Sequence, residues 1–356
     1  MTVEPTDART SSAESEDTIV ELRDVSVAFP MGNSESRVLD TVTLDVRQGE
    51  VLGIVGESGS GKSMLGSSVL DAVEEPGVTT GDVMYHPPDG DPVSVLELSD
   101  EELRELRWED IAMVFQGALD SFNPTMRIRG HFEETLEAHD KDEREGMERA
   151  RELLADLYLD PDRVLNAYPH ELSGGMSQRA LIALSLLLEP DVLVMDEPTA
   201  ALDLLMQQSI IALLDEIKEK YDLTMLFITH DLPLVAKLAD RLAVVYAFEL
   251  VEVGPTDRLL RSASHPYTRA LLRATPNTHA PLEEMQPIEG SAPNPANVPT
   301  GCSYHARCPI AKSRCTEEDP PLMGIEDEHR VACFYPEEAR EKVQFELEAV
   351  ARGDDL

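Results

Sequence analysis

The sequence predicts an α/β fold built on a parallel sheet, and three observations support this prediction. Short, continuously apolar runs at 51–55, 192–195 and 224–229 have the composition of strands buried on both faces. Helical segments at about 174–188 and 206–220 precede the second and third runs, and strands that alternate with helices typically form parallel sheets. Apolar residues make up 42% of the 356 residues, which is enough for a large buried core.

The chain before the first buried run divides into a tail and two alternating segments. Residues 1–18 carry five carboxylates and no apolar block, so we expect an acidic disordered tail and no secretory signal. Apolar and polar residues alternate from Ile19 to Phe29 and again from Val42 to Val46, which predicts two strands. Ordered structure is therefore expected to begin near Ile19.

The remaining segments interrupt or follow the α/β pattern. Ser99 and Glu102 form a capping box that predicts a helix through Trp108. Helical periodicity with many charges then predicts a polar helical insert at about 117–171. After the cassette-like part, which ends near 256, we expect a helical connector at 257–281, a small unit at 282–336 that contains all four cysteines (the cysteine segment), and an acidic helix or tail at 337–356.

The charge composition excludes some classes of function. The chain has 30 Lys and Arg against 69 Asp and Glu, a formal net charge of −39, which disfavours non-specific binding of a nucleic-acid backbone. No apolar run approaches the ~20 residues that a membrane-spanning helix requires, so we expect no membrane span. Because residues 1–18 do not resemble a secretory signal, we expect the protein to stay inside the cell. The excess of carboxylates and the scarcity of lysine favour a salt-accumulating cytoplasm, and a merely acidic mesophilic protein is the alternative.

Residues 56–63 match the phosphate-binding pattern G-x-x-x-x-G-K-[ST] between a predicted strand and a predicted helix. Glycines let such a loop wrap phosphates with its N–H groups, and the following helix adds a favourable dipole. We expect Lys62 to reach the β and γ phosphates as a catalytic residue, and Ser63 to hold Mg²⁺. The residues of this phosphate loop are Gly56, Glu57, Ser58, Gly59, Ser60, Gly61, Lys62 and Ser63.

The predicted strand 192–195 ends in two carboxylates, Asp196 and Glu197. A buried strand rarely ends in this way unless the charge has a partner. The arrangement predicts that Asp196 lies beside the bound metal and that Glu197 lies next to the water that attacks the γ phosphate. Together with the phosphate loop, it predicts a nucleoside-triphosphate site.

A second phosphate-binding helix start lies at 172–179. Ser173 is a natural N-cap, and Gly174 and Gly175 leave backbone N–H groups open. With this element, residues 19 to about 256 resemble the ATP-binding-cassette (ABC) ATPases, in which the signature loop of one subunit closes over the nucleotide held by another. The resemblance implies a parallel sheet, an antiparallel β subdomain and a helical subdomain, and it implies a second, identical or homologous ATPase subunit.

The same resemblance assigns roles to four further residues. Gln116 matches the Q-loop residue that ligates Mg²⁺ and senses the membrane partner, and Asp203 matches the D-loop. His230 matches the switch histidine that contacts the γ phosphate, with a capped core histidine as the alternative. Phe29 stands where an aromatic ring usually stacks on adenine, although it could equally be ordinary core.

A narrower resemblance extends to about residue 336, to the ATP-binding subunits of oligopeptide and dipeptide importers. It rests on 168–171 (YPHE), 121–124 (SFNP), 265–272 (HPYTRALL) and the cysteine-bearing segment. It implies ATP hydrolysis that powers peptide import at the cytoplasmic face of the membrane, with two permease subunits and an extracytoplasmic substrate-binding protein. Nickel chelates or sugars as cargo, or a non-transport or regulatory ABC ATPase, are the alternatives. The chain departs from the family at Gly117-Ala118 and Phe248-Glu249.

The four cysteines lack the close pairs typical of zinc sites, and a reducing cytoplasm disfavours disulfides. Four thiolates in one short, Pro-rich segment favour a [4Fe–4S] cluster of structural role, and zinc and unligated thiols are the alternatives. We expect the phosphate loop to draw no ligand from this segment, so that loss of a cysteine leaves ATP binding intact. The candidate cluster ligands are Cys302, Cys308, Cys315 and Cys333.

Overall fold

The computed structural model describes residues 17–32, 34–115, 117, 121–200, 202–274, 288–296 and 298–343. Thr18 already begins the first strand, one residue before the expected start, so the predicted tail is too long by this residue. Residues 1–16, Gln116, the end of the predicted connector and residues 344–356 lie outside the described residues.

Two sheets organise the described chain. A four-stranded antiparallel sheet has the order β2-β1-β4-β5, and an eight-stranded sheet has the order β11-β12-β10-β9-β3-β8-β7-β6. Strands β9, β3, β8, β7 and β6 are mutually parallel, whereas β10, β12 and β11 add antiparallel pairs. The strands are β1 (Thr18–Met31), β2 (Ser34–Arg47), β3 (Val51–Val55), β4 (Val78–Tyr85), β5 (Val93–Ser94), β6 (Ile111–Val114), β7 (Val192–Asp196), β8 (Thr224–Thr229), β9 (Arg241–Tyr246), β10 (Glu249–Pro255), β11 (Met323–Glu326) and β12 (His329–Val331).

The predicted parallel sheet is confirmed, and its apolar runs have a direct cause. Successive residues of a strand point to opposite faces. Val51 and Val55 of β3 pack into the core on the side of α7 and α8, whereas Leu52 and Ile54 pack into the core shared with β1 and β2. Because both faces are covered, the interior positions of these strands are apolar, and the polar residues Asp196, Thr224 and Thr229 lie at strand ends.

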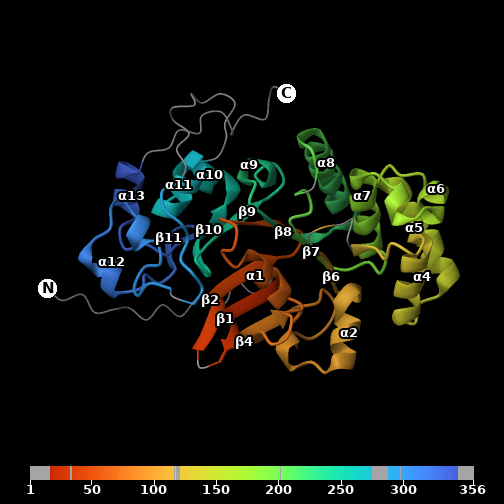
Figure 1. Cartoon of the computed structure of the whole chain (residues 1–356), viewed down its shortest axis with the longest axis horizontal. Coiled ribbons are helices and arrows are strands. Elements are labelled where there is room, and N and C mark those ends of the chain that lie inside the picture. Colours follow the sequence, from red (N-terminus) through yellow and green to blue (C-terminus); the bar gives the residue numbers. More distant parts are fainter. Residues whose placement is uncertain are drawn as a thin grey trace.

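Helices cover the larger sheet and form the predicted helical insert (Figure 1). Helices α4 to α7 stand at one end of the long axis. The side chains of Asp142, Asp160 and Ser173 cap α5, α6 and α7, whereas α4 has no side-chain cap. No helix among the described residues is long and apolar enough to cross a membrane. The helices are α1 (Lys62–Ser68), α2 (Asp100–Glu109), α4 (Ile128–Ala138), α5 (Glu143–Asp156), α6 (Pro161–Asn166), α7 (Gly174–Ser185), α8 (Leu204–Tyr221), α9 (Leu232–Val235), α10 (Thr256–Ser262), α11 (Pro266–Ala274), α12 (Ser313–Glu317) and α13 (Pro336–Lys342).

The cysteine segment lies at the opposite end of the molecule and is joined to the cassette (Figure 1). Its strand β12 pairs with β10, so that Val331 lies opposite Glu252 and the large sheet continues into the segment. The fully buried carboxylate of Glu252 accepts hydrogen bonds from the backbone of Ser264 and His265 and contacts His329 Nε2 at 2.8 Å. The segment expected as a second unit thus shares a sheet and a buried polar network with the first.

Candidate nucleotide site and cysteine pocket

The phosphate loop connects β3 to α1 and lies against backbone on two sides. A Cβ atom at Gly56 would lie 2.1 Å from the carbonyl oxygen of Val245, and a Cβ at Gly61 would lie 2.5 Å from that of Val38. Gly61 also has a φ of +105°, a conformation that side chains rarely adopt. These two glycines are therefore required by close backbone approach.

The side chain of Lys62 is folded over the loop. Its Nζ donates hydrogen bonds to the carbonyl oxygens of Gly56 at 3.0 Å and Glu57 at 2.8 Å. Burial lowers the pKa of Lys62, and the nearby charges of Glu197 and Asp196 oppose this shift. The ammonium group thus sits among loop carbonyls at the place where a phosphate would be cradled.

Asp196 is the last residue of β7, and one of its two carboxylate oxygens lacks a hydrogen-bond partner among the described residues. Burial raises its pKa, while a hydrogen bond from the Ser63 hydroxyl opposes the shift. Its Oδ1 atom is buried and has no hydrogen-bond partner among the described residues. A buried carboxylate oxygen beside a hydroxyl suits a hard cation such as Mg²⁺, so these two residues fit the expected ion; Gln116, the third expected ligand, is not described.

Glu197 and His230 follow neighbouring strands of the sheet. Because β7 and β8 are parallel, their carboxyl ends share one edge, and His230 Nδ1 lies 2.9 Å from Glu197 Oε1. Glu197 has a φ of +47°, and its N–H donates to the carbonyl of Ile228. The His230 side chain is 59% exposed, which excludes the alternative of a core histidine.

The signature residues and Asp203 begin two other helices. Ser173 Oγ accepts a hydrogen bond from the Met176 N–H and caps α7, and Asp203 Oδ1 accepts one from the Met206 N–H at 3.0 Å and caps α8. Gly175 lies under Met206, whose Cε would be 2.0 Å from an added Cβ. Asp203 therefore has a local structural role as the cap of α8.

Phe29 stands on β1 and is partly buried. Its ring packs against the core shared with β3 and approaches Gly77, where an added Cβ would lie 2.8 Å from Cζ. The ring is thus held in place by the core, whichever of its two expected roles it has.

The phosphate loop is also held from outside, which the sequence analysis missed. The Glu57 N–H donates to Tyr267 Oη at 2.8 Å, and Arg307 donates two hydrogen bonds to the Glu57 carboxylate at 2.8 and 3.0 Å. The sequence analysis expected the loop to draw no ligand from the cysteine segment and did not foresee this direct contact between the two. These partners are 210 and 250 residues away in the chain, and no local pattern signals such a distant pairing.

A turn between β9 and β10 supports the loop as well. Ala247 and Phe248 have φ values of +47° and +77°, and the Phe248 N–H donates to the Ser60 carbonyl at 2.9 Å. Phe248 occupies this left-handed position at one of the two family departures. This conformation favours glycine and costs free energy for phenylalanine, and burial of the Phe248 ring offsets that cost.

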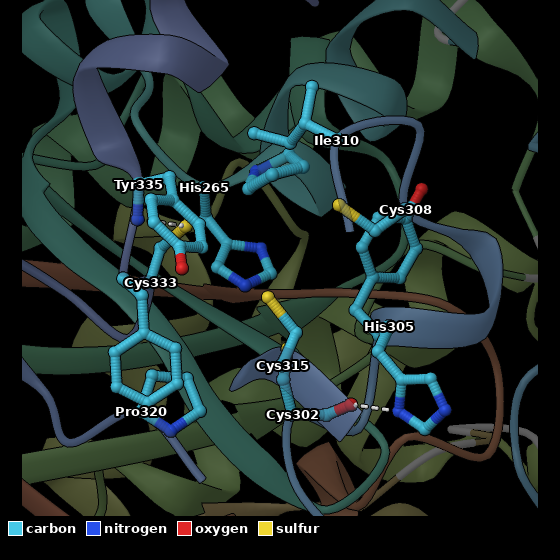
Figure 2. A pocket seen from close by; sticks show the side chains of 12 residues that line it. His265, Cys302, His305, Cys308, Ile310, Cys315, Pro320, Cys333 and Tyr335 are labelled. Atoms are coloured by element: carbon cyan, nitrogen blue, oxygen red, sulfur yellow. Dashed lines mark hydrogen bonds between the residues drawn. The ribbon is translucent and has the colours of Figure 1, made fainter. Parts of the chain in front are cut away.

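The four cysteines line a single pocket, together with His265 and Tyr304. Figure 2 shows the four labelled cysteines grouped around the His265 ring. All four are free thiols. Burial raises the pKa of Cys302 and of Cys333 to about 12, and neighbouring cysteines add to both shifts. The described residues contain no group of three or more His, Cys, Asp or Glu placed to hold a metal ion.

Two family models match the chain. Residues 39–200 match the model described as ABC transporter, and residues 251–315 match the model described as oligopeptide/dipeptide transporter, C-terminal region. The second match begins in β10 and reaches Cys315, so it includes three of the four cysteines.

Two relatives and one solved structure indicate how far the similarity extends. The dipeptide transport ATP-binding protein DppD of Caldanaerobacter subterraneus is 41% identical over 325 residues, which cover 90% of this chain and 98% of the relative. DppD of Escherichia coli is 38% identical, with coverages of 88% and 95%. A dimeric bacterial ABC transporter cassette is 28% identical with a TM-score of 0.58, over 67% of this chain and 99% of the other; the same cassette is also known in a post-hydrolysis state with ADP and phosphate. The chain therefore belongs to the ABC transporter ATPases, among the dipeptide and oligopeptide transport ATP-binding proteins.

Proposed function

We propose that this ABC ATPase powers the import of di- and oligopeptides. It would work at the cytoplasmic face of the membrane with a second ATPase subunit, identical or homologous, two permease subunits and an extracytoplasmic substrate-binding protein. The observation that carries the proposal is the match through both the cassette and the cysteine segment, over 98% of a dipeptide transport relative.

Uptake by cells tests the cargo. Cells that lack this chain, complemented with the wild type or with Glu197→Gln, would be offered labelled dipeptides, labelled oligopeptides, nickel and sugars. We expect peptide uptake to return only with the wild type. Restoration of nickel or sugar uptake alone would replace the peptide assignment, and no change in any uptake would favour a regulatory cassette.

Each residue of the site receives a proposed task. The loop amides of 56–63 and Lys62 bind the phosphates, and Asp196, Ser63 and Gln116 hold Mg²⁺, which neutralises phosphate charge when bound. Glu197 polarises the attacking water as general base. The 2.9 Å contact between His230 and Glu197 supports a linked role, in which His230 turns to the γ phosphate and leaves the carboxylate free for water.

The second half of each ATP site comes from another subunit in this proposal. Ser173, Gly174 and Gly175 close over the partner's ATP, Asp203 reaches toward it, and Phe29 stacks on the adenine of its own site. Leu204 and Leu205, next to Asp203, are 64% and 78% exposed. Two such exposed leucines side by side suit a surface that a partner covers.

For the cysteine pocket we propose a structural [4Fe–4S] cluster held by Cys302, Cys308, Cys315 and Cys333. The proposal rests on four thiols that line one cavity and on the absence of the close cysteine pairs typical of zinc sites. No group of the described residues is already placed to hold a metal ion, so binding would have to draw the sulfurs together. Metal binding would have to remove the protons that burial keeps on these thiols. Metal analysis of anaerobically purified protein decides: about four irons per chain supports the cluster, stoichiometric zinc supports the first alternative, and no metal supports unligated thiols.

We also propose that the acidic surface is an adaptation to concentrated salt. The net charge of −39 is tolerable where the Debye length is ~3 Å at 1 M salt, but not where it is ~10 Å at 0.1 M. Thermal unfolding of the full chain should occur at least ~5 °C lower in 0.1 M than in 2 M KCl. An unchanged melting temperature would leave the alternative of a merely acidic mesophilic protein.

A further inference from the structure

We propose that Arg307 and Tyr267 are positioning residues of the phosphate loop, through which the cysteine segment sets the affinity for ATP. The inference rests on the proposed role of residues 56–63 in binding ATP. It concerns two residues outside the cassette motifs, and it gives the cysteine segment a role in the ATPase cycle.

Arg307 binds the phosphate loop, and each nitrogen of its guanidinium group donates hydrogen bonds. Its two terminal nitrogens lie 2.8 and 3.0 Å from the two carboxylate oxygens of Glu57, and the Arg307 side chain is only 8% exposed. The other N–H groups donate to Tyr246 Oη and to the carbonyls of Glu289 and Ile288. A bidentate pair of this kind fixes direction as well as distance, so the second residue of the loop has one defined position.

The ion pair between Arg307 and Glu57 should affect ATP binding because Glu57 is negatively charged. A carboxylate within the phosphate loop would repel the phosphates if it stood alone. Arg307 neutralises it and draws it toward the cysteine segment. Loss of Arg307 should therefore weaken ATP binding for two reasons: an unpaired negative charge beside the phosphates and a less ordered loop.

Tyr267 fixes the loop backbone at the same residue. Its fully buried hydroxyl accepts the hydrogen bond of the Glu57 N–H at 2.8 Å. Burial raises the pKa of Tyr267, so the phenol stays neutral. Side chain and main chain of Glu57 are thus both held by residues that follow the cassette in sequence.

These contacts run without interruption to the cysteine pocket. Arg307 directly precedes Cys308, and Tyr304, which lines the pocket, packs against Tyr246 and Tyr267 with ring centroids 5.1 and 5.5 Å apart. Tyr246 and Tyr267 are themselves 4.4 Å apart. Closely packed rings transmit a displacement because they leave no free volume to absorb it.

The test compares full-length variants by ATP affinity and by melting temperature. Arg307→Met should raise the Kd for ATP about tenfold, and Tyr267→Phe about threefold, with kcat at saturating ATP changed less than about twofold. Arg330→Met is the matched control, because Arg330 also joins the cysteine segment to a cassette carboxylate, Asp45, at 2.6 Å. Arg330 is 31% exposed, so Arg330→Met should lower the melting temperature less than Arg307→Met, and it should leave the Kd for ATP unchanged.

A double mutant separates positioning from general damage. In Glu57→Gln the carboxylate is absent, so adding Arg307→Met should raise the Kd less than about threefold, because the two effects are coupled. Full additivity, or equal Kd values for Arg307→Met and Arg330→Met, would overturn the inference. Lys62→Ala distinguishes the other failure: if it leaves ATP binding intact, the loop assignment itself is wrong.

Discussion

The phosphate loop and the cysteine pocket are built in different ways: the first from one contiguous stretch of backbone, the second from side chains that are far apart in the sequence. The loop consists of eight consecutive residues and uses mostly backbone groups. Two of its glycines, Gly56 and Gly61, lie so close to neighbouring carbonyl oxygens that a side chain there would clash. The pocket uses four side chains spread over residues 302–333 and depends on walls from α11 and from the segment after β12. A site made of contiguous backbone is specified by its sequence motif. A site made of side chains also depends on how distant parts of the chain pack together. Glu57, Tyr267 and Arg307 join the two.

The largest expected effect lies on the cassette side alone. Glu197→Gln should lower ATP hydrolysis at least ~10²-fold, because the attacking water loses its polarising carboxylate. ATP binding should persist, and an ATP-bound dimer should accumulate in size-exclusion chromatography. Glu189→Gln, in the connection between α7 and β7, serves as control and should retain wild-type turnover, because this carboxylate is 70% exposed and pairs only with Arg149 among the described residues. More than about a tenth of wild-type turnover in Glu197→Gln would exclude the general-base role.

Two glycine substitutions sharpen the view of the loop as a backbone site. Gly61→Ala places a Cβ 2.5 Å from the Val38 carbonyl, whereas Gly59→Ala meets nothing within 4 Å although its φ is also positive, at +77°. Both carry a conformational cost of about 1 kcal/mol, but only the first displaces backbone. We expect titration with ATP to show at least a ~30-fold loss of affinity for Gly61→Ala and a loss of about fivefold or less for Gly59→Ala. Equal losses would mean that the close approach to Val38 is unimportant.

Local patterns predicted the parts of the molecule that are built locally. The strand at 51–55, the capping box at Ser99 and the Ser173 cap of α7 follow from short sequence signals, and each is found in the structure. The pairing of β12 with β10 and the ion pair of Arg307 with Glu57 could not be predicted, because no local pattern links residues that lie far apart in the chain. The left-handed Phe248 was noticed only as a departure, since its conformation is set by the neighbouring loop.

A substitution in the pocket tests whether the two regions are independent. Cys308→Ser should release any bound cluster and make residues 288–343 more sensitive to proteolysis. Because Arg307 precedes Cys308 and holds Glu57, we also expect the Kd for ATP to rise about fivefold. The exposed Ser313→Ala in the same segment is the control and should change neither property. An unchanged Kd after demonstrated loss of iron would show that the pocket and the loop act separately.

The smallest effect concerns Glu249, which lies where the loop, the β9–β10 turn and the cysteine segment meet. Its carboxylate accepts a hydrogen bond from Ser303 Oγ at 2.8 Å, and its neighbour Phe248 supports Ser60. Burial raises the pKa of Glu249 to about 7, and the charges of Asp319 and Asp40 add to the shift.

The sign of the pH dependence follows from this shift. In the unfolded chain the Glu249 carboxyl loses its proton near pH ~4.3, so between that pH and about 7 the folded protein binds more protons than the unfolded one. The contribution of Glu249 to stability is therefore full below pH ~4.3 and is lost as the pH rises through 7. Glu249→Gln removes this dependence and should raise the free energy of unfolding at pH 8 by about 1–3 kcal/mol, with little change near pH 5. Urea unfolding of both proteins at the two pH values measures the difference, with the exposed Glu317→Gln as control. If the wild type and Glu249→Gln lose the same stability between the two pH values, the junction between loop and cysteine segment is not governed by this carboxyl group.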